Sequence, residues 1–152
     1  MLKSVVAVIV SYIVMVIFLF AVFTAAYLAL GPERAFQPGT YAVSPLWLAF
    51  YAVANLCAAI LGGYLCAAIS QSRITCRAFA GIVFALALLL CVPAMRADKT
   101  PRVRMSDIPN LQAMHQAQIP VWMHLLNPFI CAVGVLFGSC RKRHAISIPP
   151  HS

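Results

Sequence analysis

Residues 4–30 read SVVAVIVSYIVMVIFLFAVFTAAYLAL, a run of 27 residues that contains no Asp, Glu, Lys or Arg. About 20 apolar residues are enough to carry a helix across the hydrocarbon core of a bilayer, because each residue adds about 1.5 Å. The apolar part of a secretory signal peptide is shorter, at roughly 7–15 residues. The run therefore predicts a transmembrane helix that is retained rather than cleaved.

Three more uncharged apolar runs follow, at residues 46–70, 78–95 and 119–139. All eleven Lys and Arg residues and all three acidic residues lie outside the four runs. A charged side chain at the bilayer centre costs on the order of 2.5–3.5 kcal/mol on insertion scales, so this segregation is typical of helices solvated by lipid. We predict an all-α integral membrane protein, a bundle of four transmembrane helices in which residues 1–152 form one membrane domain.

An even number of spans places both termini on the same side of the membrane. That side would carry six basic residues and no acidic ones, namely Lys3, Arg73, Arg77 and Arg141–Arg143. The opposite side would carry five basic and three acidic residues, mostly dispersed along the loop at 96–118. The positive-inside rule then predicts cytoplasmic termini, with a basic tail at 140–152. We expect the membrane to be a bacterial inner membrane. The basic end would contact anionic lipid headgroups rather than nucleic acid.

The two external loops are expected at 31–45 and 96–118. In the first, Ser44 and Pro45 predict the start of the second span, with Ser as the N-cap and Pro at the first helical position. In the second, apolar residues recur about every third position, at Ile108, Leu111, Met114 and Ala117. That spacing predicts a short helix lying in the membrane interface between the third and fourth spans.

Four aromatic residues fall near the predicted outer boundary of the membrane, namely Tyr41, Trp47, Tyr51 and Trp122. Tyr and Trp favour this depth because their rings are apolar and their polar atoms can reach water. We expect them to be interface anchors rather than a ligand cage.

Small residues spaced four apart allow transmembrane helices to approach closely, and close packing is what associates helices in lipid. The predicted packing residues are Ala54, Ala58 and Gly62 on one track of the second span, Ala59 and Gly63 on the next track, Gly81 in the third span, and Gly134 and Gly138 in the fourth. The overlapping tracks predict that the second span is central. The first span, rich in Val, Ile and Phe, should be more exposed to lipid.

Few polar side chains lie inside the spans. Asn55 is deep in the second span, where we expect an interhelical hydrogen bond. In the fourth span Pro128 removes a backbone donor and should free a carbonyl near His124, which Asn127 or the His124 imidazole could satisfy. Alternatively, Asn55, His124 and Asn127 line a polar pathway between the second and fourth spans.

A second chemical hypothesis concerns Met114, His115, Met123 and His124. Thioether and imidazole groups suit Cu(I), and His also ligates haem, so these residues are candidates for a metal or haem site. The six cysteines contain no Cys-x-x-Cys pair and are expected to pack as small apolar residues.

No catalytic motif or acidic residue lies within a span. The sequence therefore favours a non-enzymatic structural, accessory or regulatory subunit without a cofactor. Its partner would be a second copy or a larger membrane protein. The alternatives are a transporter or channel component and, third, a haem- or copper-binding membrane protein.

Overall fold

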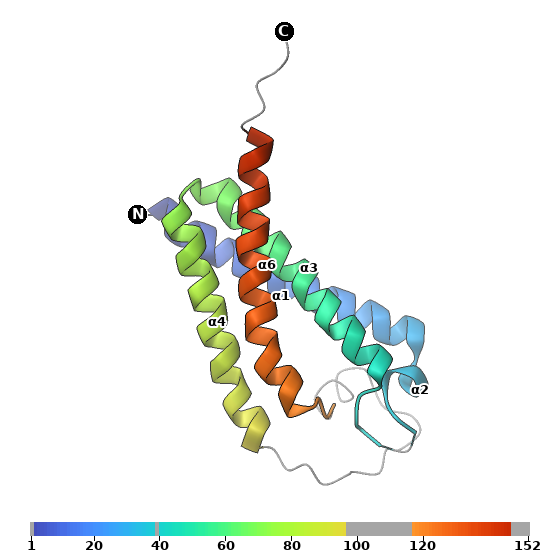
Figure 1. Ribbon diagram of the computed structural model, residues 1–152. Coiled ribbons are helices and arrows are strands. Elements are labelled where there is room, and N and C mark those ends of the chain that lie inside the picture. The colour runs from blue at the N-terminus through green and yellow to red at the C-terminus, as the bar shows by residue number, and fades with distance from the viewer. Residues whose placement is uncertain (1, 39, 97–116, 147–152) are drawn as a thin grey trace.

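The computed structural model describes residues 2–38, 40–96 and 117–146. Its helices are α1 (Leu2–Leu30), the single turn α2 (Pro32–Ala35), α3 (Pro45–Ser70), α4 (Arg73–Arg96) and α6 (Val121–Ile146) (Figure 1). The four long helices are each long and apolar enough to cross a membrane. In the described ranges extended backbone is limited to two isolated bridges. The prediction of an all-helical chain with four candidate spans is confirmed.

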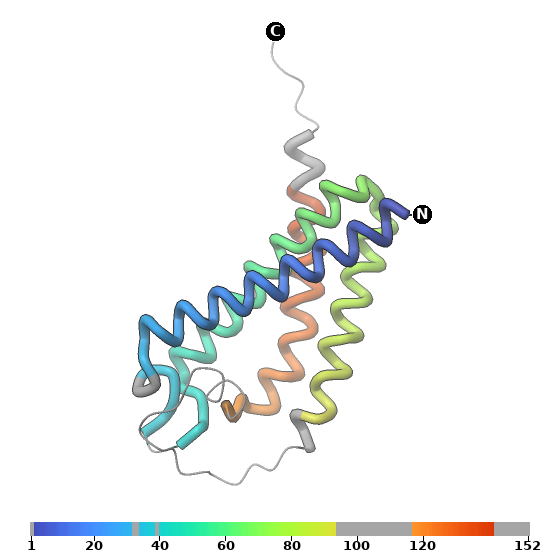
Figure 2. Tube along the Cα trace, turned by 180° about the vertical axis from the view of Figure 1, so that it is seen from behind, coloured from blue at the N-terminus to red at the C-terminus, as the bar shows by residue number. Residues whose placement is uncertain are grey.

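The four long helices form two pairs that cross at a slant, α1 with α3 and α4 with α6 (Figures 1 and 2). Helix α3 contacts all three other long helices and packs against them more extensively than any other long helix does, which confirms its predicted central position. Helix α1 buries only Ala7, Ser11, Met15 and Tyr27, so most of its apolar surface faces outward as expected.

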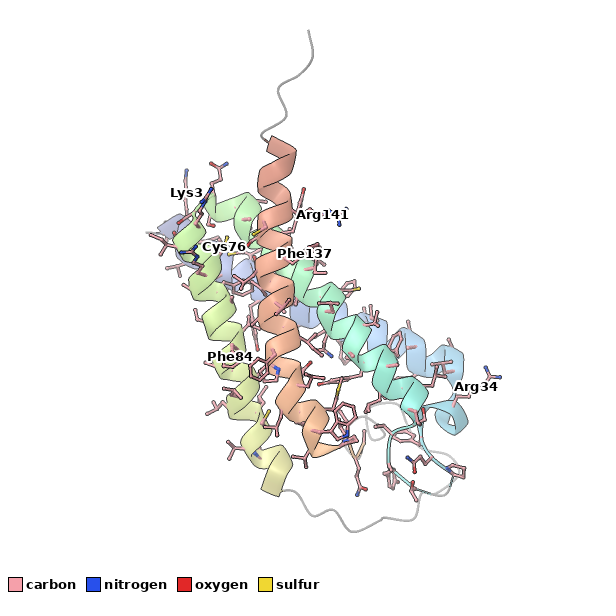
Figure 3. All side chains as sticks on the ribbon, in the orientation of Figure 1. Lys3, Arg34, Cys76, Phe84, Phe137 and Arg141 are labelled. Atoms are coloured by element: carbon pink, nitrogen blue, oxygen red, sulfur yellow. The ribbon has the colours of Figure 1, made fainter. Side chains whose placement is uncertain are left out.

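The two ends of the bundle differ in what they hold. The start of α1 and the end of α6 lie at one end, with Lys3 and Arg141, and we call it the termini end (Figure 3). The opposite end holds Arg34 and the connection from α1 to α3, and we call it the loop end. Helices α3 and α6 both run from the loop end to the termini end, so they are parallel to each other.

The boundaries of α3 follow directly from local chemistry. The Trp47 N–H donates to Ser44 Oγ at 3.1 Å, and Pro45 is the first helical residue, which confirms the predicted start signal. The helix ends where Gln71 adopts a left-handed backbone (φ 53°) and its N–H donates to the Ala67 carbonyl at 3.1 Å. The link to α4 therefore consists of Gln71 and Ser72 alone.

Two helices are longer than the uncharged runs that predicted them. Helix α4 begins at Arg73 rather than residue 78, and α6 continues to Ile146 rather than stopping at 139. A charge-free run measures the part of a helix that lipid tolerates, whereas basic side chains at the ends of a span reach the headgroup depth through their long stems. The predicted tail at 140–152 therefore begins as a continuation of α6.

Two features of the loops need comment. The turn α2 was not predicted, although it lies in the loop expected at 31–45. The predicted interfacial helix lies mostly outside the described residues. Of its last residues, Gln118 is bridged to the α1–α3 connection, because its N–H donates to the Tyr41 carbonyl at 2.9 Å.

Candidate functional site

Helices α3 and α6 meet along a contact that we call the seam. It comprises Leu56, Ala59, Ile60 and Gly63 of α3 with Gly134, Val135 and Gly138 of α6. A Cβ atom added to Gly63 would fall against the Val135 carbonyl oxygen, and one added to Gly138 would fall against the Ile60 carbonyl oxygen. In glycine that position holds a hydrogen, so each glycine directs a Cα–H group at a carbonyl of the other helix. Such contacts contribute roughly 0.5–1 kcal/mol each.

The two small-residue tracks of α3 serve different neighbours. Ala59 belongs to the seam, where a Cβ on Gly134 would lie 2.6 Å from the Ala59 Cβ. Gly62 faces the other side, where an added Cβ would meet the Met15 sulfur of α1 and lie 3.6 Å from Phe79 of α4. The other two residues of that track, Ala54 and Ala58, are also buried. This division of neighbours explains why α3 is central.

Gly81, also predicted to pack, has no packing neighbour within the described chain. It is exposed, and nothing lies within 4 Å of an added Cβ, so it packs against no other part of the described chain. Helix α4 turns Cys76, Phe79 and Val83 inward, and Gly81 lies on another side of the helix.

Two polar groups of the spans have unexpected hydrogen-bond partners, whereas the buried Ser11 and Thr24 hydroxyls of α1 have none among the described residues. The Asn55 amide donates to the Tyr51 carbonyl of its own helix at 2.8 Å, instead of bonding another helix. The carbonyl freed by Pro128 is that of His124, and it accepts from the Cys91 thiol of α4 at 2.9 Å. The same thiol also lies 3.2 Å from the Ala87 carbonyl of its own helix, so its single proton has two acceptors within reach, of which the His124 carbonyl is the nearer. A cysteine expected only to pack is therefore positioned to replace the backbone donor that proline lacks.

The three residues proposed for a pathway are not joined to one another. Among the described residues no hydrogen bond links any two of Asn55, His124 and Asn127, and the Asn127 Oδ1 accepts from the Cys131 thiol at 3.9 Å. Beside the seam a groove of about 370 Å³ has an entirely apolar lining of Ala52, Val53, Leu56, Phe129, Ile130 and Val133. The described part of α3 and α6 therefore presents no continuous polar row.

The candidate metal residues are only partly within the described chain. Met123 is buried and His124 is half-buried, whereas Met114 and His115 lie outside the described residues. The described residues contain no group of three or more His, Cys, Asp or Glu side chains suited to a metal ion. The four-residue site is therefore neither assembled nor excluded by the described geometry.

Aromatic side chains gather at the loop end, and sequence reasoning missed how they come together. Trp122 is 57% exposed, as an interface anchor should be, but Trp47 is only 8% exposed and Tyr41 is also buried. Trp47 joins Phe23 and Tyr27 of α1 in a cluster completed by Phe36, Tyr41, Phe50 and Tyr51. The available signal was a pair of aromatic residues four apart on each of two consecutive spans, near the same end.

No protein-family model, curated protein or solved structure matches this chain. The seam and the aromatic cluster are the two built features from which its function can be argued.

Proposed function

We propose that this protein is a non-enzymatic membrane protein that serves as a structural or accessory subunit. The observation that supports this role over transport is the seam. At Gly63 and Gly138 the backbones of α3 and α6 touch, which leaves no space for water or a solute between these helices. A bundle fixed in this way suits a scaffold whose outer surface meets other helices.

The proposed setting is a bacterial inner membrane, crossed by all four long helices with both termini in the cytoplasm. Lys3 and Arg141 at the termini end support this orientation, because basic residues are retained on the cytoplasmic side (Figure 3). A reporter fused after Ser152 and another inserted near Gly39 should then report the cytoplasmic and the outer compartment. Reporters that both lie on one side would contradict the topology, and a swapped pair would contradict the orientation.

The proposed partner is a second copy or a larger membrane protein. Helices in lipid associate where small residues allow their backbones to approach. Gly81, which packs against nothing in the described chain, offers such a place on the outer face of α4. Its exposure supports contact with a helix from another chain.

The test is the mass of the protein extracted with its native lipid, measured for the wild type and two variants. We expect a complex of fixed stoichiometry for the wild type and for Ile82→Leu, a mild change at a neighbouring exposed position. The Gly81→Leu variant should keep its helix content and lose the partner. A wild-type protein that runs as a lone chain would overturn the proposed role. A complex that survives Gly81→Leu would overturn the α4 contact alone.

A further inference from the structure

A pocket of about 150 Å³ lies within the aromatic cluster at the loop end. We call it the aromatic pocket, and its lining is Phe23, Tyr27, Phe36, Trp47, Tyr51, Ala117 and Ile119. Five of these seven residues are aromatic, and none carries a formal charge. The pocket is therefore an apolar space with walls made mainly of rings.

Helices α1 and α3 supply two of its walls. Phe23 and Tyr27 are one turn apart on α1, and Trp47 and Tyr51 are one turn apart on α3. The Phe23 and Tyr51 rings stack with centroids 5.6 Å apart, and the Tyr27 and Trp47 rings are nearly perpendicular, at 87° and 6.4 Å. These contacts hold the rings in fixed orientations.

Backbone hydrogen bonds attach the remaining walls. Phe36 is bridged to Val43, and the Val43 N–H donates to the Gln118 carbonyl at 3.3 Å. Ala117 and Ile119 flank Gln118, so the bonds of that residue hold both of them against the α1–α3 connection. The Ser44 hydroxyl donates to the Arg34 carbonyl at 2.6 Å and ties the ends of that connection together. The pocket is therefore built into the fold before any ligand arrives.

The size and lining of the pocket limit what it can hold. The pocket is partly open to its surroundings, and its volume of about 150 Å³ matches that of an enclosed apolar cavity that can hold one benzene-sized molecule. An anionic group would lose its hydration there without gaining a positively charged partner among the lining side chains. An aromatic ring placed in the pocket can make offset-stacked or edge-to-face contacts with walls that are themselves aromatic rings.

We infer that the aromatic pocket is a binding site for a neutral molecule or substituent that carries a single aromatic ring of benzene or phenol size. This site is additional to the proposed role as a subunit and does not depend on a partner.

The two tryptophans of the chain provide the test. Trp47 lines the pocket and Trp122 is exposed on α6, so Trp122→Phe and Trp47→Phe leave a single reporter inside or outside the pocket. The probe is bromobenzene, whose bromine quenches indole fluorescence on contact. We expect the quenching of Trp47 to saturate as the probe concentration rises. The quenching of Trp122, caused by probe dissolved in the detergent, should rise linearly with concentration and with an initial slope several-fold smaller. Unbrominated benzene should compete and restore the Trp47 signal.

A matched pair of substitutions locates the effect. Ala117→Phe should fill the pocket and remove the saturable quenching of Trp47, whereas Ala49→Phe, at an exposed position of α3 near the same end, should keep it. Circular dichroism confirms that each variant is folded, and the benzene competition tests the site without either variant.

Three results would overturn the inference. Equal, linear quenching of Trp47 and Trp122 would mean that no ring enters the pocket. Equally strong saturable quenching by 1-bromohexane would mean that the pocket takes lipid chains rather than rings. Competition by tetramethylammonium but not by benzene would mean that it is a cage for a cation.

Discussion

Replacing Gly138 by Ala should destabilise the protein, whereas the same replacement at Gly81 should not. At Gly138 the new Cβ would lie 2.8 Å from the Ile60 carbonyl carbon and 3.0 Å from its Cα, while ordinary contact begins at 3.4 Å. The opposing atoms are backbone and cannot rotate away, so α3 and α6 must separate by at least about 0.6 Å in an overpacked site.

The expected magnitude is a difference between two variants. Overpacking costs about 1–3 kcal/mol and the lost Cα–H contact about 0.5–1 kcal/mol. Both variants gain roughly the same helix propensity, about 1 kcal/mol for Gly to Ala, so that gain cancels in the comparison. Because nothing lies within 4 Å of a Cβ at Gly81, the Gly138→Ala variant should be less stable than Gly81→Ala by roughly 1.5–4 kcal/mol.

The measurement is reversible unfolding in mixed micelles by SDS titration, followed by circular dichroism, for the wild type and both variants. Measured on single chains freed of any partner, Gly81→Ala should match or exceed the wild type. If the two alanine variants have the same free energy of unfolding, the seam is not where α3 and α6 are held together.

Two further substitutions test the interior contacts by the same titration. Cys91→Ala should cost about 1 kcal/mol by leaving the His124 carbonyl without a donor, and Cys91→Ser should restore it. The loss of stability caused by Cys91→Ala should be smaller in a Pro128→Ala background, because residue 128 then has a backbone N–H that can donate to the His124 carbonyl. An equal loss in both backgrounds would mean that Cys91 does not compensate for the donor missing at Pro128. Gly62→Ala should cost less than Gly138→Ala, at about 1 kcal/mol, because the atom in its way ends the flexible Met15 side chain. A larger cost than at Gly138 would contradict this reasoning.

The helices and their central member could be predicted because the relevant signals are local. Each of these signals depends only on residues that are neighbours in the chain or on the surface of one helix. The signals are the absence of charge in 46–70, the helix start at Ser44 and Pro45, and the small residues around Gly63. The Pro128 effect could be anticipated for the same reason, since a proline always frees the carbonyl four residues before it.

The remaining features depend on which side of a helix its neighbour occupies, and one sequence does not determine that. The spacing around Gly81 shows that a helix could approach there, but the bundle turns that face outward. The packing of α4 on α6 places the Cys91 thiol beside the His124 carbonyl. The wall of the aromatic pocket formed by Ala117 and Ile119 flanks Gln118, which bonds to the α1–α3 connection, far from it in the chain.

The claim that α3 is sealed against α6 is tested most directly by the water accessibility of Asn55, which is 5% exposed. Asn55→Cys would be made in a chain whose native cysteines are replaced, with Ser at position 91. The protein would be reconstituted into proteoliposomes and treated with a membrane-impermeant thiol reagent on both sides of the membrane. Gln37→Cys in the exposed connection is the positive control, and Val53→Cys on the outer apolar face is the lipid-facing control. We predict that Gln37→Cys reacts and that Asn55→Cys is as unreactive as Val53→Cys. Labelling of Asn55→Cys at a rate close to that of Gln37→Cys would reveal a water-filled pathway and contradict the account.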